Sequence, residues 1–119
     1  MPLTTIPAPT RPSGSALPTA SARLIQFTDT HLMRDPAGSI RGARTLPRLQ
    51  ACLVHAQRHF FPVDAMLLTG DVVHDEPEAY GTIDLLFGDL GVPVLVIPGN
   101  HDVPDEMRRQ LGHVPFQVG

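Results

Sequence analysis

Residues 92–102 read VPVLVIPGNHD, an apolar run that ends in a proline, a glycine and three polar side chains. The first part of this run, residues 92–97, is rich in β-branched residues, which is typical of a buried strand. Two further runs, residues 24–28 (LIQFT) and residues 65–69 (AMLLT), are also short and apolar, and each is followed at once by polar residues. The sequence therefore predicts three strands with polar groups at their carboxyl ends.

Two segments between the expected strands carry apolar residues at the period of a helix. The first has spacings of 3, 4, 3 and 4, at Leu46, Leu49, Leu53, Ala56 and Phe60. We expect this helix to have Thr45 as its N-cap and to end at Phe61-Pro62. The second helix is expected to begin near Pro77 and to end at a Gly91 cap. Its apolar positions are Ala79, Ile83, Leu86 and Leu90.

The predicted elements alternate in the order β-α-β-α-β-α, with a short last helix that begins at Pro104. Helices of this length between strands imply parallel pairing through right-handed crossovers. The third strand is apolar on both faces, which is typical of a parallel sheet that is covered on both sides. The sequence therefore predicts an α/β fold built on parallel strands.

The 119 residues suffice for one domain, and residues 1–22 differ in composition from the rest. They are rich in Pro, Thr, Ser and Ala, so we expect a disordered leader before a structured segment, residues 23–119. The leader lacks the basic start and apolar run of a signal peptide. Because no run approaches the roughly 20 apolar residues of a membrane span, we expect no membrane partner. The net charge of −3 does not favour nucleic acid either.

Cys52 is the single cysteine, which excludes an internal disulfide and is typical of the reducing cytoplasm. It borders the apolar stripe of the first helix, so we expect it to be buried. His55 and His59 are four residues apart, a spacing that can chelate a metal ion. They lie off the apolar stripe with no third ligand nearby, so we expect both to be exposed. Three arginines follow the first expected strand: Arg34, Arg41 and Arg44. We expect them to be exposed to solvent, and the alternative is that they contact the phosphate or base of a substrate.

Three polar loops follow the expected strands: Asp29-Thr30-His31, Gly70-Asp71-Val72-Val73-His74 and Gly99-Asn100-His101-Asp102. The carboxyl ends of parallel neighbours, about 4.8 Å apart, meet at one edge of a sheet, so we expect the three loops to converge. Carboxylate, imidazole and amide groups gathered in this way are typical of a metal site. The alternative is a set of ordinary loop residues and helix caps.

These three motifs, with Pro77-Glu78-Ala79-Tyr80 after the second, resemble the calcineurin-like metallophosphoesterase superfamily. The resemblance is strongest to its bacterial cyclic-AMP phosphodiesterase branch and covers about Arg23 to Asp105. It implies two metal ions, of which Fe, Mn or Zn suit mixed histidine and carboxylate ligands better than Ca or Mg.

The resemblance also implies a role for each motif residue. Asp29 and His31 would bind the first ion, Asp71 would bridge the two ions, and Asn100 would bind the second. His101 would stabilise the phosphoryl transition state or protonate the leaving oxygen, work that suits a group titrating near neutrality. His31, Asp71, Asn100 and His101 would together contact the substrate.

Four polar residues beside these ligands have less direct expected roles. We expect Asp102 to orient His101 without touching a metal ion. His74 is expected either to support the site in the same way or to lie exposed. Asp75 and Glu76 are expected to cap the second helix.

By resemblance, the complete fold is a four-layer α/β/β/α sandwich, of which this chain would supply the N-terminal half. One face of the sheet and an edge strand would then lie bare. The family pattern needs further histidine ligands beyond Gly119, and we do not count His113 among them. We therefore interpret the chain as a truncated, N-terminal fragment of a larger enzyme.

The expected function is hydrolysis of a small phosphodiester, such as the 3′,5′-cyclic nucleotide cyclic AMP, by a hydroxide that two metal ions activate. Two alternatives stay open. The first is a non-catalytic fragment or a weak binder of a single metal ion, and the second is one half of a split enzyme that needs a partner chain.

Overall fold

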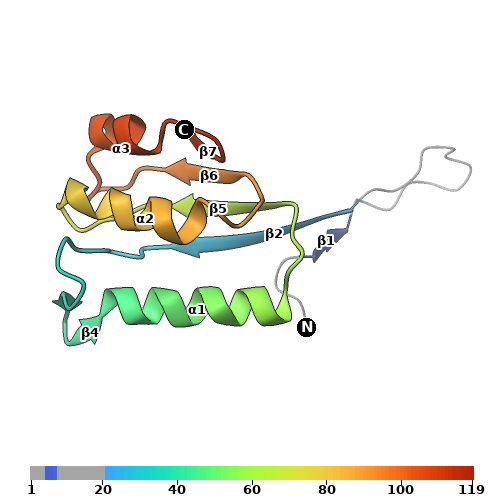
Figure 1. Cartoon of the computed structure of the whole chain (residues 1–119), viewed down its shortest axis with the longest axis horizontal. Coiled ribbons are helices and arrows are strands. Elements are labelled where there is room, and N and C mark those ends of the chain that lie inside the picture. The colour runs from blue at the N-terminus through green and yellow to red at the C-terminus, as the bar shows by residue number, and fades with distance from the viewer. Residues whose placement is uncertain (1–4, 8–20) are drawn as a thin grey trace, which may run out of the picture.

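The three expected strands form the centre of one five-stranded sheet, with the order β1-β2-β5-β6-β7 (Figure 1). The computed structural model describes residues 5–7 and 21–119. Strands β2, β5, β6 and β7 are parallel, and β1 is antiparallel to β2. The predicted α/β class and parallel pairing are therefore confirmed.

The elements have the following bounds. They are β1 (Thr5–Pro7), β2 (Ser21–Thr28), β3 (Ser39–Ile40), β4 (Ala43–Arg44), α1 (Thr45–His59), β5 (Ala65–Thr69), the 3-10 helix η1 (Pro77–Ala79), α2 (Tyr80–Phe87), β6 (Val94–Ile97), α3 (Pro104–Leu111) and β7 (Phe116–Val118). Strands β3 and β4 form a small separate hairpin.

The carboxyl ends of the three central strands are in register. Thr28 pairs with Thr69, and Thr69 pairs with Ile97. Because these three residues end β2, β5 and β6, the chain leaves all three strands at the same level of the sheet. The three polar loops therefore begin side by side.

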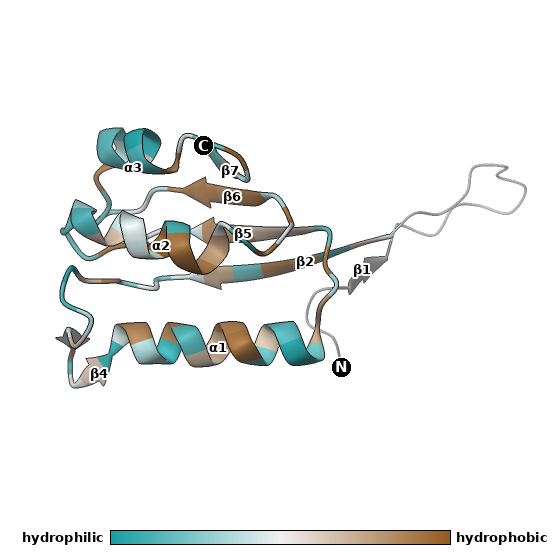
Figure 2. Cartoon of the chain, in the orientation of Figure 1, coloured by the Kyte–Doolittle hydropathy of each residue, from teal (hydrophilic) through white to brown (hydrophobic). Residues whose placement is uncertain are grey.

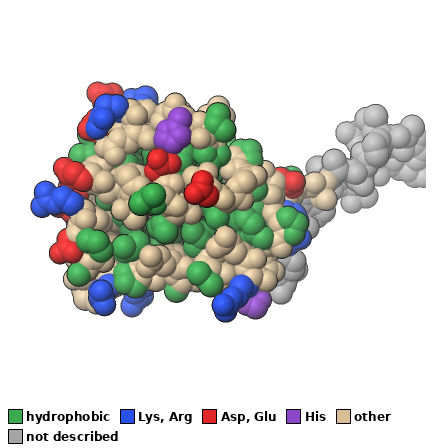
Figure 3. All heavy atoms as spheres, viewed as in Figure 1, with side chains coloured by type: hydrophobic (Ala, Val, Ile, Leu, Met, Phe, Trp, Pro, Cys, Tyr) green, Lys and Arg blue, Asp and Glu red, His purple; other side chains and the backbone are tan. Residues whose placement is uncertain are grey.

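One face of the sheet carries the core. Each crossover moves one strand further along the sheet in the same direction, so right-handed connections place all three helices on one face. Met66, Leu68, Val94 and Val96 point to this face and are fully buried. Figure 2 shows apolar residues along β6 and alternating apolar and polar residues along α1. In Figure 3, apolar side chains lie across the face that carries α2, and arginines lie around its margin.

The opposite face of the sheet lies bare in this segment. Ile97 is 52% exposed and Leu95 is 38% exposed, and Leu67 lies beside Leu95 in the register. The alternation of buried and exposed residues along β6 shows that helices cover only one side. The apolar pattern predicted a sheet covered on both faces, and this prediction is wrong for these residues. The bare face that we expected of an N-terminal half is observed.

Some elements differ from the prediction in their boundaries, and one strand was not predicted. Helix α1 begins at Thr45 with Arg44 as its N-cap, and no side chain caps it. Helix α2 ends at Phe87 with Gly88 as its C-cap, because the chain turns there before Gly91, whose φ is +78°. Strand β7 was not predicted, because three residues are too short a run to show a period.

The expected disordered leader, residues 1–22, falls mainly outside the described residues. Within the described part, Thr5–Pro7 pairs with Ser21–Arg23, so β2 begins two residues before the expected structured segment. Cys52, which we expected to be buried, is exposed. Leu49, Leu53 and Ala56 form the buried stripe of α1, and Cys52 lies just outside it. No helix among the described residues is long and apolar enough to cross a bilayer.

One apolar cavity lies between a helix and the sheet, outside the polar loops. Its volume is about 580 Å³, and it opens between α1 and β2, where Leu24, Phe27 and Ala56 are among its mainly apolar lining residues. It contains none of the residues that the motifs single out, so it is a feature of the packing between α1 and the sheet edge.

Replacing Phe87 with Ala tests the core on the covered face. The Phe87 side chain is fully buried and packs edge-to-face on Phe27, with ring centroids 5.7 Å apart. Because the substitution leaves a cavity, we expect the free energy of unfolding to fall by about 3–5 kcal/mol. Denaturant titration of the natural protein measures this change. The control, Leu85→Ala, alters an 81% exposed residue of α2 and should cost less than about 0.5 kcal/mol. Equal effects of the two substitutions would show that Phe87 is not a core residue.

Candidate metal centre

Backbone hydrogen bonds hold the three polar loops together beyond the ends of the strands. The Asp29 N–H donates to the Gly70 carbonyl at 3.0 Å, and the His31 N–H donates to the Asp71 carbonyl at 2.9 Å. On the other side, the Gly70 N–H donates to the Ile97 carbonyl at 2.8 Å. The predicted convergence of the loops at one edge of the sheet is therefore observed.

The loop backbones are strained where they carry the candidate ligands. Asp29, His31, Asp71 and Asp75 have φ values of +55°, +47°, +46° and +62°. Among the described non-glycine residues, Arg41 alone shares this left-handed region. Such conformations are uncommon for residues with a side chain and gather where a side chain must be aimed at a ligand.

Gly99 allows the second and third loops to touch. A Cβ atom there would lie 2.2 Å from the Asp71 backbone nitrogen and 2.7 Å from Asp71 Oδ1. Any larger residue would push the loops apart. Their contact lets the His101 N–H donate to Asp71 Oδ1 at 2.7 Å.

The first cluster contains Asp29, His31 and Asp71, whose possible ligand atoms lie within 4.8 Å of one another. His31 Nε2 is 3.7 Å from Asp29 Oδ1 and 3.9 Å from Asp71 Oδ2. The His101 backbone hydrogen bond, followed by the nearby imidazoles of His101 and His31, lowers the pKa of Asp71 below its usual value despite an opposing effect of burial. Two carboxylates and one imidazole make a donor set that fits Mn, Fe or Zn.

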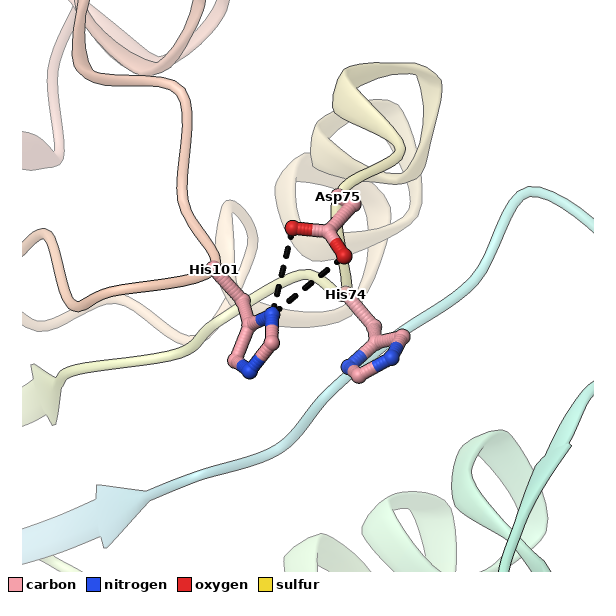
Figure 4. Close-up of side chains that lie close together, drawn as sticks. All are labelled: His74, Asp75 and His101. Carbon is pink, nitrogen blue, oxygen red and sulfur yellow. Dashed lines mark hydrogen bonds and ion pairs between the residues drawn. The ribbon is translucent and has the colours of Figure 1, made fainter.

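The second cluster contains His74, Asp75 and His101 (Figure 4). His101 Nδ1 is 3.1 Å and 3.3 Å from the two carboxylate oxygens of Asp75. The imidazole rings of His74 and His101 are stacked, with centroids 4.5 Å apart. Because the carboxylate engages Nδ1, Nε2 of His101 is left available to another partner.

Among the described hydrogen bonds, the Asp102 carboxylate makes none to the His101 ring, which we expected it to orient. Its Oδ2 accepts hydrogen bonds from the backbone of Val72 and Gly99, at 3.1 and 2.7 Å. Its Oδ1 accepts from the Val73 backbone at 3.0 Å and from Tyr80 Oη at 2.8 Å. The carboxylate turns into the protein because backbone N–H groups there need an acceptor.

Asp75 is the candidate site residue that the motif analysis missed. We expected it, with Glu76, to cap the following helix, but no side chain caps η1. Glu76 instead accepts a hydrogen bond from the Arg34 N–H at 3.0 Å. The left-handed φ of Asp75 turns its carboxylate towards His101. Sequence spacing cannot show this orientation, because a carboxylate just before a helix is also typical of a residue that caps the helix.

Tyr80 links the start of α2 to the third loop. Its hydroxyl donates to Asp102 and accepts a hydrogen bond from the Val103 N–H at 3.0 Å. Burial, with a smaller contribution from Asp102, raises the pKa of Tyr80 above its usual value. The hydroxyl is therefore protonated, and able to donate, throughout the neutral range.

The remaining candidates lie at the edge of these clusters or away from them. Asn100 is exposed at the same edge of the sheet and takes part in none of the described side-chain hydrogen bonds. His55 and His59 are exposed on α1, as expected, with ring centroids 4.4 Å apart. His113 pairs with Asp84 and lies in neither cluster. The three arginines expected near the first loop are exposed: Arg34, Arg41 and Arg44.

Comparison with known proteins agrees with this geometry. The chain is 35% identical over 94 residues to a probable cyclic nucleotide phosphodiesterase of Synechococcus sp., an alignment that covers 78% of this chain and 36% of that protein. It is 33% identical over 97 residues to the 3′,5′-cyclic adenosine monophosphate phosphodiesterase CpdA of Haemophilus influenzae, covering 81% of this chain and 35% of the relative. It is 32% identical over 93 residues to the 3′,5′-cyclic adenosine monophosphate phosphodiesterase CpdA of Escherichia coli K12, an alignment that covers 77% of this chain and 34% of that protein.

The chain therefore spans about a third of the length of these curated relatives. Residues 22–118 also match the family described as calcineurin-like phosphoesterase, whose members use divalent metal ions. This match covers both clusters and the strands that position them. The chain belongs to the calcineurin-like phosphoesterase family.

Proposed function

We propose that this chain carries part of the catalytic site of a metal-dependent phosphodiesterase whose substrate is a 3′,5′-cyclic nucleotide such as cyclic AMP. The observation that carries the proposal is the contact between the two clusters, in which the His101 N–H donates to Asp71 Oδ1. This contact places a metal-type donor set directly beside a histidine paired with a carboxylate. The names of the three relatives, all cyclic nucleotide phosphodiesterases, support the substrate class.

In this proposal, Asp29, His31 and Asp71 hold a first metal ion, and Asp71 and Asn100 hold a second. When bound, the two ions supply an activated water nucleophile and neutralise the charge that develops at phosphorus. Iron, manganese and zinc fit the histidine and carboxylate donors. Asp71 would be shared between the two ions, because a carboxylate, unlike an imidazole, offers two donor oxygens.

His101 would stabilise the transition state or protonate the leaving oxygen. Asp75 accepts the Nδ1 hydrogen bond, which fixes the ring and leaves Nε2 to meet the substrate. Asp102 would act more indirectly, because its carboxylate holds the backbones of the second and third loops in place. His31, Asp71, Asn100 and His101 would all contact the phosphoester.

The donor sets favour a site that other residues complete. The first cluster offers three protein ligands, the usual minimum for a catalytic metal ion, whereas the second ion would have only Asp71 and Asn100. We propose that further ligands and the substrate pocket lie in residues beyond this chain. The three-ligand cluster also supports the alternatives of a weak single-metal binder and of a split enzyme with a partner chain.

Metal stoichiometry separates these alternatives. We expect the natural protein to bind two equivalents of Mn²⁺ tightly in equilibrium dialysis, and residues 1–119 alone to bind one equivalent weakly. A single weak equivalent in the natural protein would contradict a two-metal site. We also propose that the protein acts in the reducing cytoplasm, which its single cysteine favours. Its partner would be a small-molecule substrate and neither a nucleic acid nor a membrane.

Replacing Asp71 with Asn should abolish metal-dependent hydrolysis of cyclic AMP. The amide keeps the shape of the side chain but removes the charge and the second anionic oxygen. We expect kcat/KM of the natural protein to fall by more than the roughly 10–100-fold that loss of an indirect contact costs. A steady-state assay with Mn²⁺ measures this fall. Retention of full activity would overturn the assignment of the metal centre.

Replacing Asp75 with Asn tests the partner of His101. We expect kcat to fall about 10–100-fold with little change in KM, because the ring loses its charged partner. The matched control is Asp84→Asn, since Asp84 also pairs with a histidine nitrogen at 3.1 Å but lies on α2 outside both clusters. The control should keep the activity of the unmodified protein. If the two variants behave alike, Asp75 has no special role in the reaction.

A further inference from the structure

We propose that His74 is the positioning residue for His31, by accepting a hydrogen bond from the Nδ1–H group of the His31 ring. The inference rests on the proposed function, because it assumes that His31 binds a metal ion. It assigns one definite role to a residue for which the sequence left two readings open. It also predicts which ring nitrogen of each histidine carries the proton.

The two nitrogens of the His31 ring face different partners. Nε2 faces the two carboxylates of the first cluster, 3.7 Å from Asp29 and 3.9 Å from Asp71. On the opposite side, Nδ1 lies 3.1 Å from Nδ1 of His74. Nε2 is thus the nitrogen that points to the other possible metal ligands, and Nδ1 points away from them.

The positions of the protons follow from this arrangement. A neutral imidazole carries a hydrogen on one nitrogen and a lone pair on the other. If the Nε2 lone pair of His31 binds a metal ion, its hydrogen must be on Nδ1. Nδ1 of His74 must then be the acceptor, and the hydrogen of His74 must be on its Nε2. Histidine ligands commonly donate their second N–H to such a supporting group, which fixes the ring orientation.

The structure holds His74 in place for this role. Its backbone N–H donates to the carbonyl of Leu32, the residue after His31, at 2.9 Å. Leu32 and Val73 also form a parallel bridge between the first and second loops. The His74 ring is partly buried and stacks on His101. The His74 ring therefore lies beside both the proposed ligand His31 and the proposed catalytic residue His101, with ring centroids 5.2 and 4.5 Å away.

A direct ligand role for His74 agrees less well with the distances. The group of ligand atoms within 4.8 Å around Asp29, His31 and Asp71 does not include His74. His74 belongs instead to the group with Asp75 and His101, in which Asp75 already engages His101 Nδ1. Nδ1 of His74 faces the His31 nitrogen that points away from the carboxylates. We therefore infer support of the ligand and not ligation.

The test compares three variants of the natural protein. His74→Leu removes the acceptor, His74→Gln supplies an amide oxygen in its place, and His113→Leu is the control at a histidine outside both clusters. We expect His74→Leu to weaken Zn²⁺ binding about 10–100-fold in isothermal titration calorimetry. His74→Gln should restore most of the affinity, and His113→Leu should leave it unchanged.

Nitrogen-15 NMR of the histidine rings in the Zn²⁺ form gives a second readout that does not depend on activity. We expect a hydrogen on Nδ1 of His31 and on Nε2 of His74 in the unmodified protein. The opposite assignment for His74 would overturn the inference. If His74→Leu does not fold, the affinity of His74→Gln and this assignment decide the question.

Further outcomes separate the inference from the proposed function. If His74→Leu binds Zn²⁺ normally while Asp71→Asn does not, the metal centre stands and the role of His74 is wrong. If Asp71→Asn also binds normally, the proposed function itself fails. X-ray absorption that shows one imidazole fewer around Zn²⁺ in His74→Leu would identify His74 as a direct ligand and overturn the positioning role.

Discussion

The site depends on the Asp102 carboxylate, which accepts four hydrogen bonds inside the protein. Three come from backbone N–H groups of Val72, Val73 and Gly99, and the fourth comes from the Tyr80 hydroxyl. Hydrogen bonds to a charged acceptor contribute about 1.5–3 kcal/mol each. Together they bind the second loop, the third loop and the start of α2 to one anchor. Among the described side chains, Asp102 alone has hydrogen bonds to all three segments.

This anchoring offsets the strain of the loops. Left-handed backbone at a residue with a side chain costs about 1–3 kcal/mol, and four such residues lie in the first two loops. In return, the carboxylates of Asp29 and Asp71 turn towards His31, and that of Asp75 turns towards His101. Close contact at Gly99 then brings the two clusters together. The loops are thus held by the hydrogen bonds of Asp102 together with those that Asp29, His31 and Asp71 make themselves.

Much of the fold follows from local patterns. Three strands, two long helical segments and the last helix at Pro104 were predictable, because burial on one face imposes a period on the sequence. Strand β7 and the β3-β4 hairpin were not, since runs of two or three residues carry no period. The exposure of Cys52 was also missed, because the margin of a helical stripe faces protein or solvent according to what packs beside it.

By itself, the sequence determined the residue types of the site and their order after the strands: Asp29, His31, Asp71, His74, Asn100 and His101. It also determined that they would meet, because parallel strands align their carboxyl ends. Only the tertiary structure decided which hydrogen-bond partner each carboxylate has. Asp75 and Asp102 are both aspartates next to a histidine, yet the first contacts the His101 ring and the second binds backbone. Their orientations depend on backbone dihedrals and on unpaired N–H groups from distant loops, which no local pattern records.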